Sequence, residues 1–117
     1  MTSRNIMTSV EGEIIESISN LTFGTKCNRL LIHFRHNCLR FLGNNAYVND
    51  FEFSSHYRLK GARLLGLRRM RTPDAVYIIV ETSYGSLTTR WVAYRSDQLF
   101  DVECDLIYQH GDTNAIC

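Results

Sequence analysis

The stretch AVYIIVETSYGSLTTRWVAY, residues 75–94, decides the fold of this chain. It begins with residues 76–80, which are apolar at every position, a pattern typical of a strand that is covered on both faces. Ser83, Tyr84 and Gly85 then supply turn residues, and an alternating strand follows them. The pattern predicts a β-hairpin whose first strand lies in the middle of a sheet.

Strand patterns continue on both sides of this hairpin. Residues 28–43 predict an earlier hairpin that turns at His36-Asn37, because Leu30, Ile32 and Phe34 alternate before the turn. The other expected strands cover residues 14–18, 46–53, 62–72 and 99–108, with Gly66 marking a bulge or a close backbone approach and residues 43–45 a turn. Residues 54–61 predict one short helix, with a serine N-cap and a glycine terminator. The sequence therefore predicts a mainly β protein, an antiparallel sheet or small sandwich or barrel of about seven or eight strands.

The 117 residues are expected to form a single domain that is long enough to bury a core. We expect flexible ends at residues 1–11 and 110–117. The beginning of the chain lacks the apolar core of a signal peptide, and no window approaches the roughly 20 apolar residues of a membrane span. We therefore expect no membrane partner and a cytoplasmic location. The four cysteines are widely spaced without a C-x-x-C motif, so free thiols are expected.

Charge is distributed unevenly along the chain. Residues 26–71 hold ten basic and two acidic residues, whereas residues 72–117 hold two basic and seven acidic ones. Eleven of the thirteen basic residues are arginine, whose planar guanidinium binds phosphate or carboxylate in two places. Proteins that bind duplex nucleic acid present a broad positive surface to its phosphates, so a net charge of +1 argues against duplex binding. A small anion held by a few arginines fits this distribution better.

The candidate ligand-binding residues combine arginines with an accessible aromatic ring, which suits a phosphorylated nucleotide. They are Arg63, Arg68, Arg69, Arg71, Arg90, Tyr94 and Arg95. In the competing interpretation the arginines form structural ion pairs or a solvated edge strand that blocks aggregation. Trp91 shares a face with Leu87 and is expected in the core.

The strand at 99–108 carries an acidic outer face made by Asp101, Glu103 and Asp105. One interpretation places these acids beside Arg90 on the hairpin partner of their strand, as cross-strand charge pairs, and the other keeps Arg90 as a ligand contact. No glycine-rich phosphate loop or nucleophile motif is present in the sequence. His33 and His36 are expected to face opposite sides of a strand end, away from any third ligand. We predict a protein that is not an enzyme and that uses no cofactor and no metal.

Two stretches of the sequence carry a resemblance to a known family. GEIIESISNLTFGTKCNRLLIHFRHNCLRFLG (residues 12–43) resembles the beginning, and VETSYGSLTTRWVAYRSDQLFDVECDL (residues 80–106) the end, of a small uncharacterised domain found in bacteriophages and some bacteria. The first has the G-x-x-I-x-S-I opening, and the second matches at Gly85, Thr88, Arg90, Trp91, Glu103 and Asp105. The middle differs, because the family has an acidic segment with paired cysteines where this chain is basic. The resemblance implies a phage accessory protein, a class that includes inhibitors and sponges acting on bacterial defence.

Together these observations predict a binding protein that sequesters a phosphorylated, cyclic nucleotide signal of bacterial immunity, an anti-defence sponge. Leu64, Leu65, Leu67 and Met70, which surround the arginines, predict a homo-oligomer interface. The alternative is an inhibitor that binds a host defence nuclease through the acidic strand. A third interpretation is a structural or assembly module with no small ligand.

Overall fold

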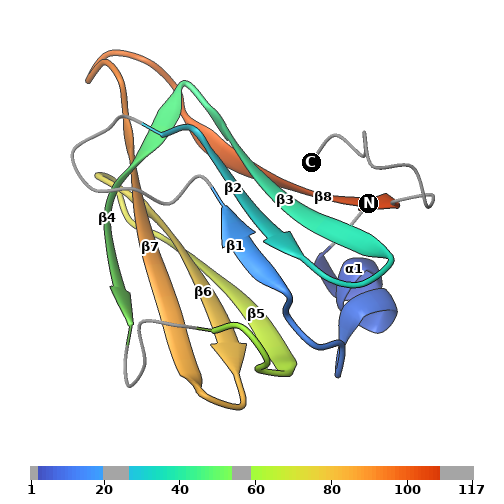
Figure 1. Ribbon diagram of the computed structural model, residues 1–117. Coiled ribbons are helices and arrows are strands. Elements are labelled where there is room, and N and C mark those ends of the chain that lie inside the picture. The colour runs from blue at the N-terminus through green and yellow to red at the C-terminus, as the bar shows by residue number, and fades with distance from the viewer. Residues whose placement is uncertain (1–2, 20–26, 54–58, 109–117) are drawn as a thin grey trace.

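The computed structural model describes residues 3–19, 27–53 and 59–108. Two antiparallel sheets of four strands each pack against one another as a β-sandwich (Figure 1). One sheet has the order β1-β2-β3-β8, formed by Ser17–Ser19, Arg29–His33, Asn37–Asn44 and Asp101–Tyr108. The other has the order β4-β7-β6-β5, formed by Ala46–Phe53, Gly85–Ala93, Val76–Thr82 and Leu64–Arg71. The predicted mainly β class is confirmed.

The hairpin of residues 75–94 is formed by β6 and β7, as its pattern predicts. β6 lies between β7 and β5, and Val76, Ile78 and Val80 are buried between the two sheets. Ile79 lies on the other face of β6 and is still only 7% exposed. The register of β5 with β6 shifts between Leu64 and Gly66, so the predicted bulge is present.

The centre of the core is Trp91 of β7, which is completely buried together with Leu87 on the same strand. Its indole Nε1 donates a hydrogen bond to Thr89 Oγ1 at 2.8 Å, and that hydroxyl donates to the carbonyl of Ile78 at 3.2 Å. The predicted core position of Trp91 is confirmed. The only polar atom of this side chain is thereby satisfied inside the core, where an unpaired N–H group is costly.

The chain passes from the first sheet to the second through one residue. β3 ends at Asn44 and β4 begins at Ala46, and Asn45 between them has a positive φ of 55°. The backbone of Ala46 comes so close to Gly43 that only glycine fits there, because a Cβ atom at Gly43 would lie 2.2 Å from the carbonyl oxygen of Ala46. The turn predicted at residues 43–45 is present, and it moves the chain between sheets.

Residues Ser3–Val10 form a helix, α1, in a segment that the sequence assigned to a flexible N-terminus. The helix is held by tertiary packing, since Val10 is fully buried in the core and Met7 packs against it. α1 contacts β5 and β8. Most of the helix expected at residues 54–61 and the flexible end expected at 110–117 lie outside the described residues. The first strand is shorter than predicted, and Ile14 instead forms an isolated bridge with Arg63.

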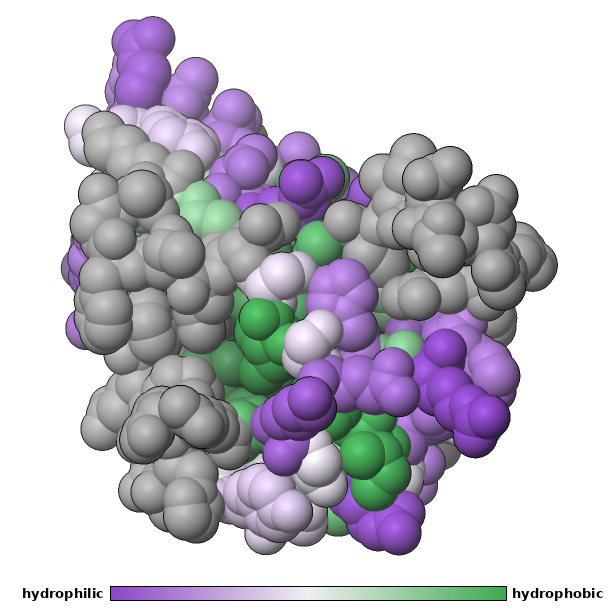
Figure 2. All heavy atoms as spheres, in the orientation of Figure 1, coloured by the Kyte–Doolittle hydropathy of each residue, from purple (hydrophilic) through white to green (hydrophobic). Residues whose placement is uncertain are grey.

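The surface of the sandwich mixes residue types. On the face seen in Figure 2, green hydrophobic areas are small and are bordered by purple hydrophilic side chains. Among the described helices, none is long and apolar enough to cross a membrane.

Cys27 and Cys104 are thiols, as expected, whereas Cys38 is disulfide-bonded and corrects that expectation. Sequence spacing alone does not show which cysteines approach one another in space.

Candidate functional site

The candidate site lies on the open side of the sandwich, where the edge strands β5 and β8 face each other. Among the described strands, each of the two has a single neighbour, β6 for β5 and β3 for β8. Arg69 of β5 hydrogen-bonds across this opening to β8, and α1 contacts both strands. The site is therefore built between two sheets and draws on residues that are distant in the sequence.

The alternation of β5 decides which arginines turn toward this opening. Leu67, Arg69 and Arg71 pair with Val80, Ile78 and Val76, whose side chains form the inner face of the sheet. Successive side chains of a strand point to opposite faces, so Arg68 and Met70 lie on the outer face. The sequence LRRMR thus places two of its three arginines on the side that faces the other sheet.

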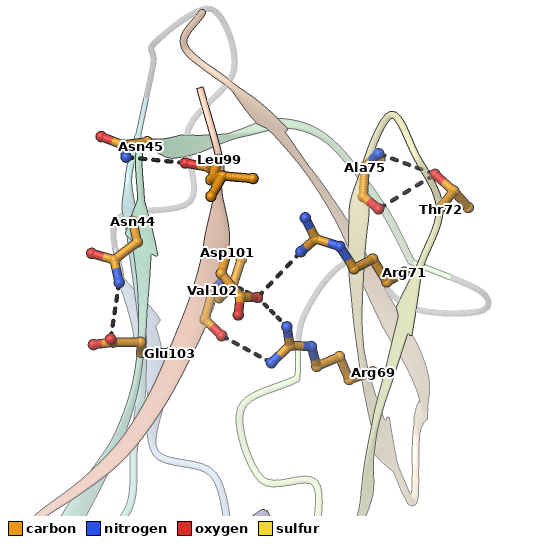
Figure 3. Close-up of polar contacts among 10 residues, drawn as sticks. All are labelled: Asn44, Asn45, Arg69, Arg71, Thr72, Ala75, Leu99, Asp101, Val102 and Glu103. Atoms are coloured by element: carbon orange, nitrogen blue, oxygen red, sulfur yellow. Dashed lines mark hydrogen bonds and ion pairs between the residues drawn. The ribbon is translucent and has the colours of Figure 1, made fainter. Parts of the chain in front are cut away.

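Arg69 and Arg71 converge on one carboxylate, that of Asp101 at the start of β8 (Figure 3). Arg69 Nη2 donates to Asp101 Oδ1, and Arg71 Nη1 lies 3.6 Å from the same oxygen. The three side chains, here called the arginine clamp, are 43%, 44% and 48% exposed. Two guanidiniums directed at one oxygen define a position for an anionic atom.

Neighbouring groups fix the geometry of the arginine clamp. Arg69 Nη1 donates to the carbonyl of Val102 at 3.4 Å, and Asp101 Oδ1 accepts the Val102 N–H at 2.8 Å. The guanidinium carbon of Arg71 lies 4.8 Å from the ring centroid of Phe100, a cation–π distance. The clamp is accordingly held by main-chain and aromatic contacts as well as by its ion pairs.

A groove of about 770 Å³ runs beside the arginine clamp between β5 and β8. Its apolar lining comes from Phe41, Leu67, Ile78, Val102 and Cys104, and its polar lining from Arg68, Arg69, Asp101, Glu103 and Asp105. A shallower hollow of about 480 Å³ lies next to it and includes Arg71 and Phe100. Arg69 and Asp101 line both spaces, so the clamp separates them. The larger space has the size and mixed lining of ligand-binding pockets.

The remaining predicted residues do not join the arginine clamp. Arg68 lines the groove, and its Nε lies 2.6 Å from Glu81 Oε1. Arg63 Nη1 donates to the carbonyl of Gly12 at 3.0 Å, and Arg95 lies 3.3 Å from Asp97. Arg90 lies on β7 in register with Tyr77 and Asp50, and the Tyr94 ring lies 4.8 Å from that of Tyr47. The seven predicted residues therefore divide into two in the clamp, one beside it and four elsewhere.

The acidic strand is not beside Arg90, which corrects that expectation. β8 pairs with β3, so the cross-strand partner of Asp105 is Arg40, with Nη2 2.8 Å from Oδ2. The chain between β7 and β8 crosses to the other sheet, and sequence adjacency alone predicted a hairpin there. Arg40 was missed, although it is the only basic residue of the strand that β8 joins.

Two side chains on the strands, Cys104 of β8 and His33 of β2, have shifted pKa values. Burial and the nearby Asp105 carboxylate raise the pKa of the Cys104 thiol to about 12, so this thiol is protonated at neutral pH. Burial lowers the pKa of His33, whose Nε2 lies 2.8 Å from Ser19 Oγ. Within the described part of the chain, no group of three His, Cys, Asp or Glu side chains is placed to hold a metal ion.

Comparison of the chain with protein-family models, with curated proteins and with solved structures finds no match.

Proposed function

We propose that this protein is a non-enzymatic binding protein that sequesters a phosphorylated nucleotide at the arginine clamp. The observation that supports the proposal is the convergence of Arg69 and Arg71 on one carboxylate oxygen. A phosphate oxygen carries the same kind of charge and accepts the same hydrogen bonds as a carboxylate oxygen. Asp101 therefore marks the position that a ligand phosphate takes.

Binding requires that the phosphate displaces Asp101 from the two guanidiniums. A phosphate monoester has more charge than a carboxylate and offers three oxygens, and the phosphodiester of a cyclic nucleotide has one charge but keeps two free oxygens, so either group can engage both arginines at once. Asp101 is 48% exposed and is able to turn into solvent when it is displaced. The internal carboxylate thus lowers the affinity of the clamp, yet keeps both guanidiniums oriented while the site has no ligand.

Sequestration fits this site better than a reaction does. The thiol that lines the groove, Cys104, is kept protonated by its burial and by Asp105, and a protonated thiol is a poor nucleophile. The resemblance to phage accessory proteins gives the proposal its setting, because a sponge of this kind removes a cyclic nucleotide immune signal from the host cytoplasm.

Assembly into a homo-oligomer belongs to the same proposal. Leu64 is fully buried, so Leu65 and Met70, each 53% exposed, are the side chains of β5 that support it.

The acidic strand is a weaker candidate for a protein-binding surface. Asp101 is paired with Arg69 and Arg71, and Asp105 is paired with Arg40. Glu103 accepts a hydrogen bond from Asn44 Nδ2 at 2.9 Å. Since two of the three carboxylates are neutralised within the protein, β8 presents much less negative charge than its sequence indicates.

The test is a melting-temperature panel of the purified protein against inorganic phosphate, AMP, ATP, NAD and cyclic dinucleotides. A ligand at a hundred times its Kd adds about 2.7 kcal/mol of stability, which raises Tm by on the order of 10 °C for a chain of this length. Arg69→Ala and Arg71→Ala should abolish the shift. The matched control is Arg95→Ala, which removes an exposed ion-paired arginine elsewhere and should leave the shift unchanged. A panel without any shift would refute the nucleotide proposal.

A further inference from the structure

The free edge of β8 offers main-chain hydrogen-bonding groups to the groove beside the arginine clamp. Gly43 of β3 directs its N–H toward β2, where it donates to the carbonyl of Asn28 at 2.7 Å. Gly43 lies opposite Val102, so this is a pair that exchanges no hydrogen bonds between β3 and β8. The main-chain groups of Val102 therefore point away from the sheet, and both are bound within the clamp region.

Cys104 is the next residue of β8 with this orientation, because strands repeat every two residues. It lies opposite Phe41, and it lines the groove. β8 is the last strand in the order of its sheet among the described residues, so the N–H and C=O of Cys104 have no strand partner there. A donor and an acceptor from the same residue thus face a groove whose lining includes Phe41, Leu67 and Ile78.

We infer that this groove takes the base of the nucleotide, and that the Cys104 main chain recognises a base edge with one donor beside one acceptor. The inference rests on the proposed function, which places the phosphate at Arg69 and Arg71. Adenine has such an edge, formed by its amino group and an adjacent ring nitrogen. The apolar residues of the groove accept the flat base, and Cys104 supplies hydrogen bonds in both directions.

The spacing along β8 agrees with a nucleotide that spans both parts of the site. Two residues of a strand cover about 7 Å, which is the separation between Val102 at the clamp and Cys104. One ribose is of a size to connect a phosphate at the clamp with a base at Cys104. The groove volume of about 770 Å³ lies within the range of small-molecule sites, so a base and a sugar fit into it together.

The first measurement uses the unaltered protein and three probes: AMP, ribose 5-phosphate and N6,N6-dimethyl-AMP. AMP should bind at least about tenfold more tightly than ribose 5-phosphate, and the dimethyl analogue should lose most of that advantage because it has no amino donor. If AMP and ribose 5-phosphate bind equally, the clamp stands and base recognition at Cys104 is overturned. If neither AMP nor ribose 5-phosphate binds, the placement of a phosphate at Arg69 and Arg71 fails, and this inference, which rests on it, fails as well.

The second measurement removes the groove-facing donor. Cys104→Pro deletes an N–H that makes no hydrogen bond within the sheet, and edge strands tolerate proline at such positions. This variant should bind AMP about tenfold less tightly and ribose 5-phosphate unchanged. Cys104→Ala is the matched control, since it changes the same side chain but keeps the N–H. Equal AMP affinities for the two variants, each with an unaltered near-UV circular dichroism spectrum, would contradict the inference.

Discussion

Thr89→Val should destabilise the protein by leaving the indole N–H of Trp91 without a partner. Valine has nearly the shape of threonine, so the core keeps its packing while the acceptor of the 2.8 Å hydrogen bond disappears. Both residues are completely buried, so water is not available to replace the hydroxyl. The perturbation therefore removes one buried hydroxyl together with the two hydrogen bonds that it makes.

The magnitude follows from the cost of an unsatisfied buried donor, about 1–3 kcal/mol. An unfolding entropy of roughly 2.1 cal/mol/K per residue makes 1 kcal/mol worth about 4 °C in a protein of this length. The expected fall in Tm is therefore about 4–12 °C. The loss of the second hydrogen bond, from Thr89 to the Ile78 carbonyl, acts in the same direction.

Urea unfolding followed by fluorescence of Trp91, the only tryptophan, measures the change directly. The matched control is Thr88→Val, on the same strand but on the outer face, which should alter stability by less than about 0.5 kcal/mol. A cycle with Trp91→Phe, followed by thermal circular dichroism, should reduce the cost of Thr89→Val because the N–H is then absent. An equal cost for Thr88→Val and Thr89→Val would refute this account of the core.

Three further predictions concern other parts of the chain. Gly43→Ala should lower the free energy of unfolding by more than about 2 kcal/mol in chemical denaturation, because its Cβ would lie 2.2 Å from the carbonyl oxygen of Ala46. The control is Gly66→Ala, whose Cβ would contact only the Glu81 side chain, at 3.3 Å from Oε2, and which should cost far less. The pKa of His33 is lowered in the folded protein, so the unfolded chain binds more protons below pH 6.5 and the free energy of unfolding should fall as pH decreases through this range. His33→Gln should remove that part of the pH dependence. Identical profiles of stability against pH for the wild type and His33→Gln would contradict this assignment. Asp101→Asn should tighten AMP binding several-fold in calorimetry, because it removes the charge that competes for Arg69 and Arg71. The free energy of unfolding should fall by less than about 1 kcal/mol. Weaker AMP binding would show instead that Asp101 contacts the ligand favourably.

The local part of the fold could be predicted from the sequence. Apolar periodicity identified β6 and β7, the glycine in β5 identified the bulge, and the shared face of Leu87 and Trp91 identified the core. α1 could not be found this way. Its residues include serine, threonine and asparagine, which are weak helix formers, and its stability comes from packing of Met7 and Val10 against distant strands.

The candidate site could be predicted only in part. The sequence singled out Arg69 and Arg71 by their number and type, but it did not identify Asp101 as the partner of both. That pairing depends on which strands become edges and on the crossing between β7 and β8, which are long-range features of the topology. Arg90 was placed beside the acids for the same reason, because neighbours in sequence were taken to be neighbours in the sheet.

The single-residue crossing at Asn45 has a consequence for how this chain folds. β3 pairs on one edge with the preceding β2, but its other edge pairs with β8, and β4 pairs with β7, so both strands of the crossing need residues 85–108. As the chain leaves the ribosome, its first half exposes β-strands whose partners have not yet been made. Folding dominated by such distant contacts is slow, on a timescale of roughly milliseconds to seconds. The second edge of β3 and the unpaired β4 are therefore open to aggregation until residues 85–108 emerge.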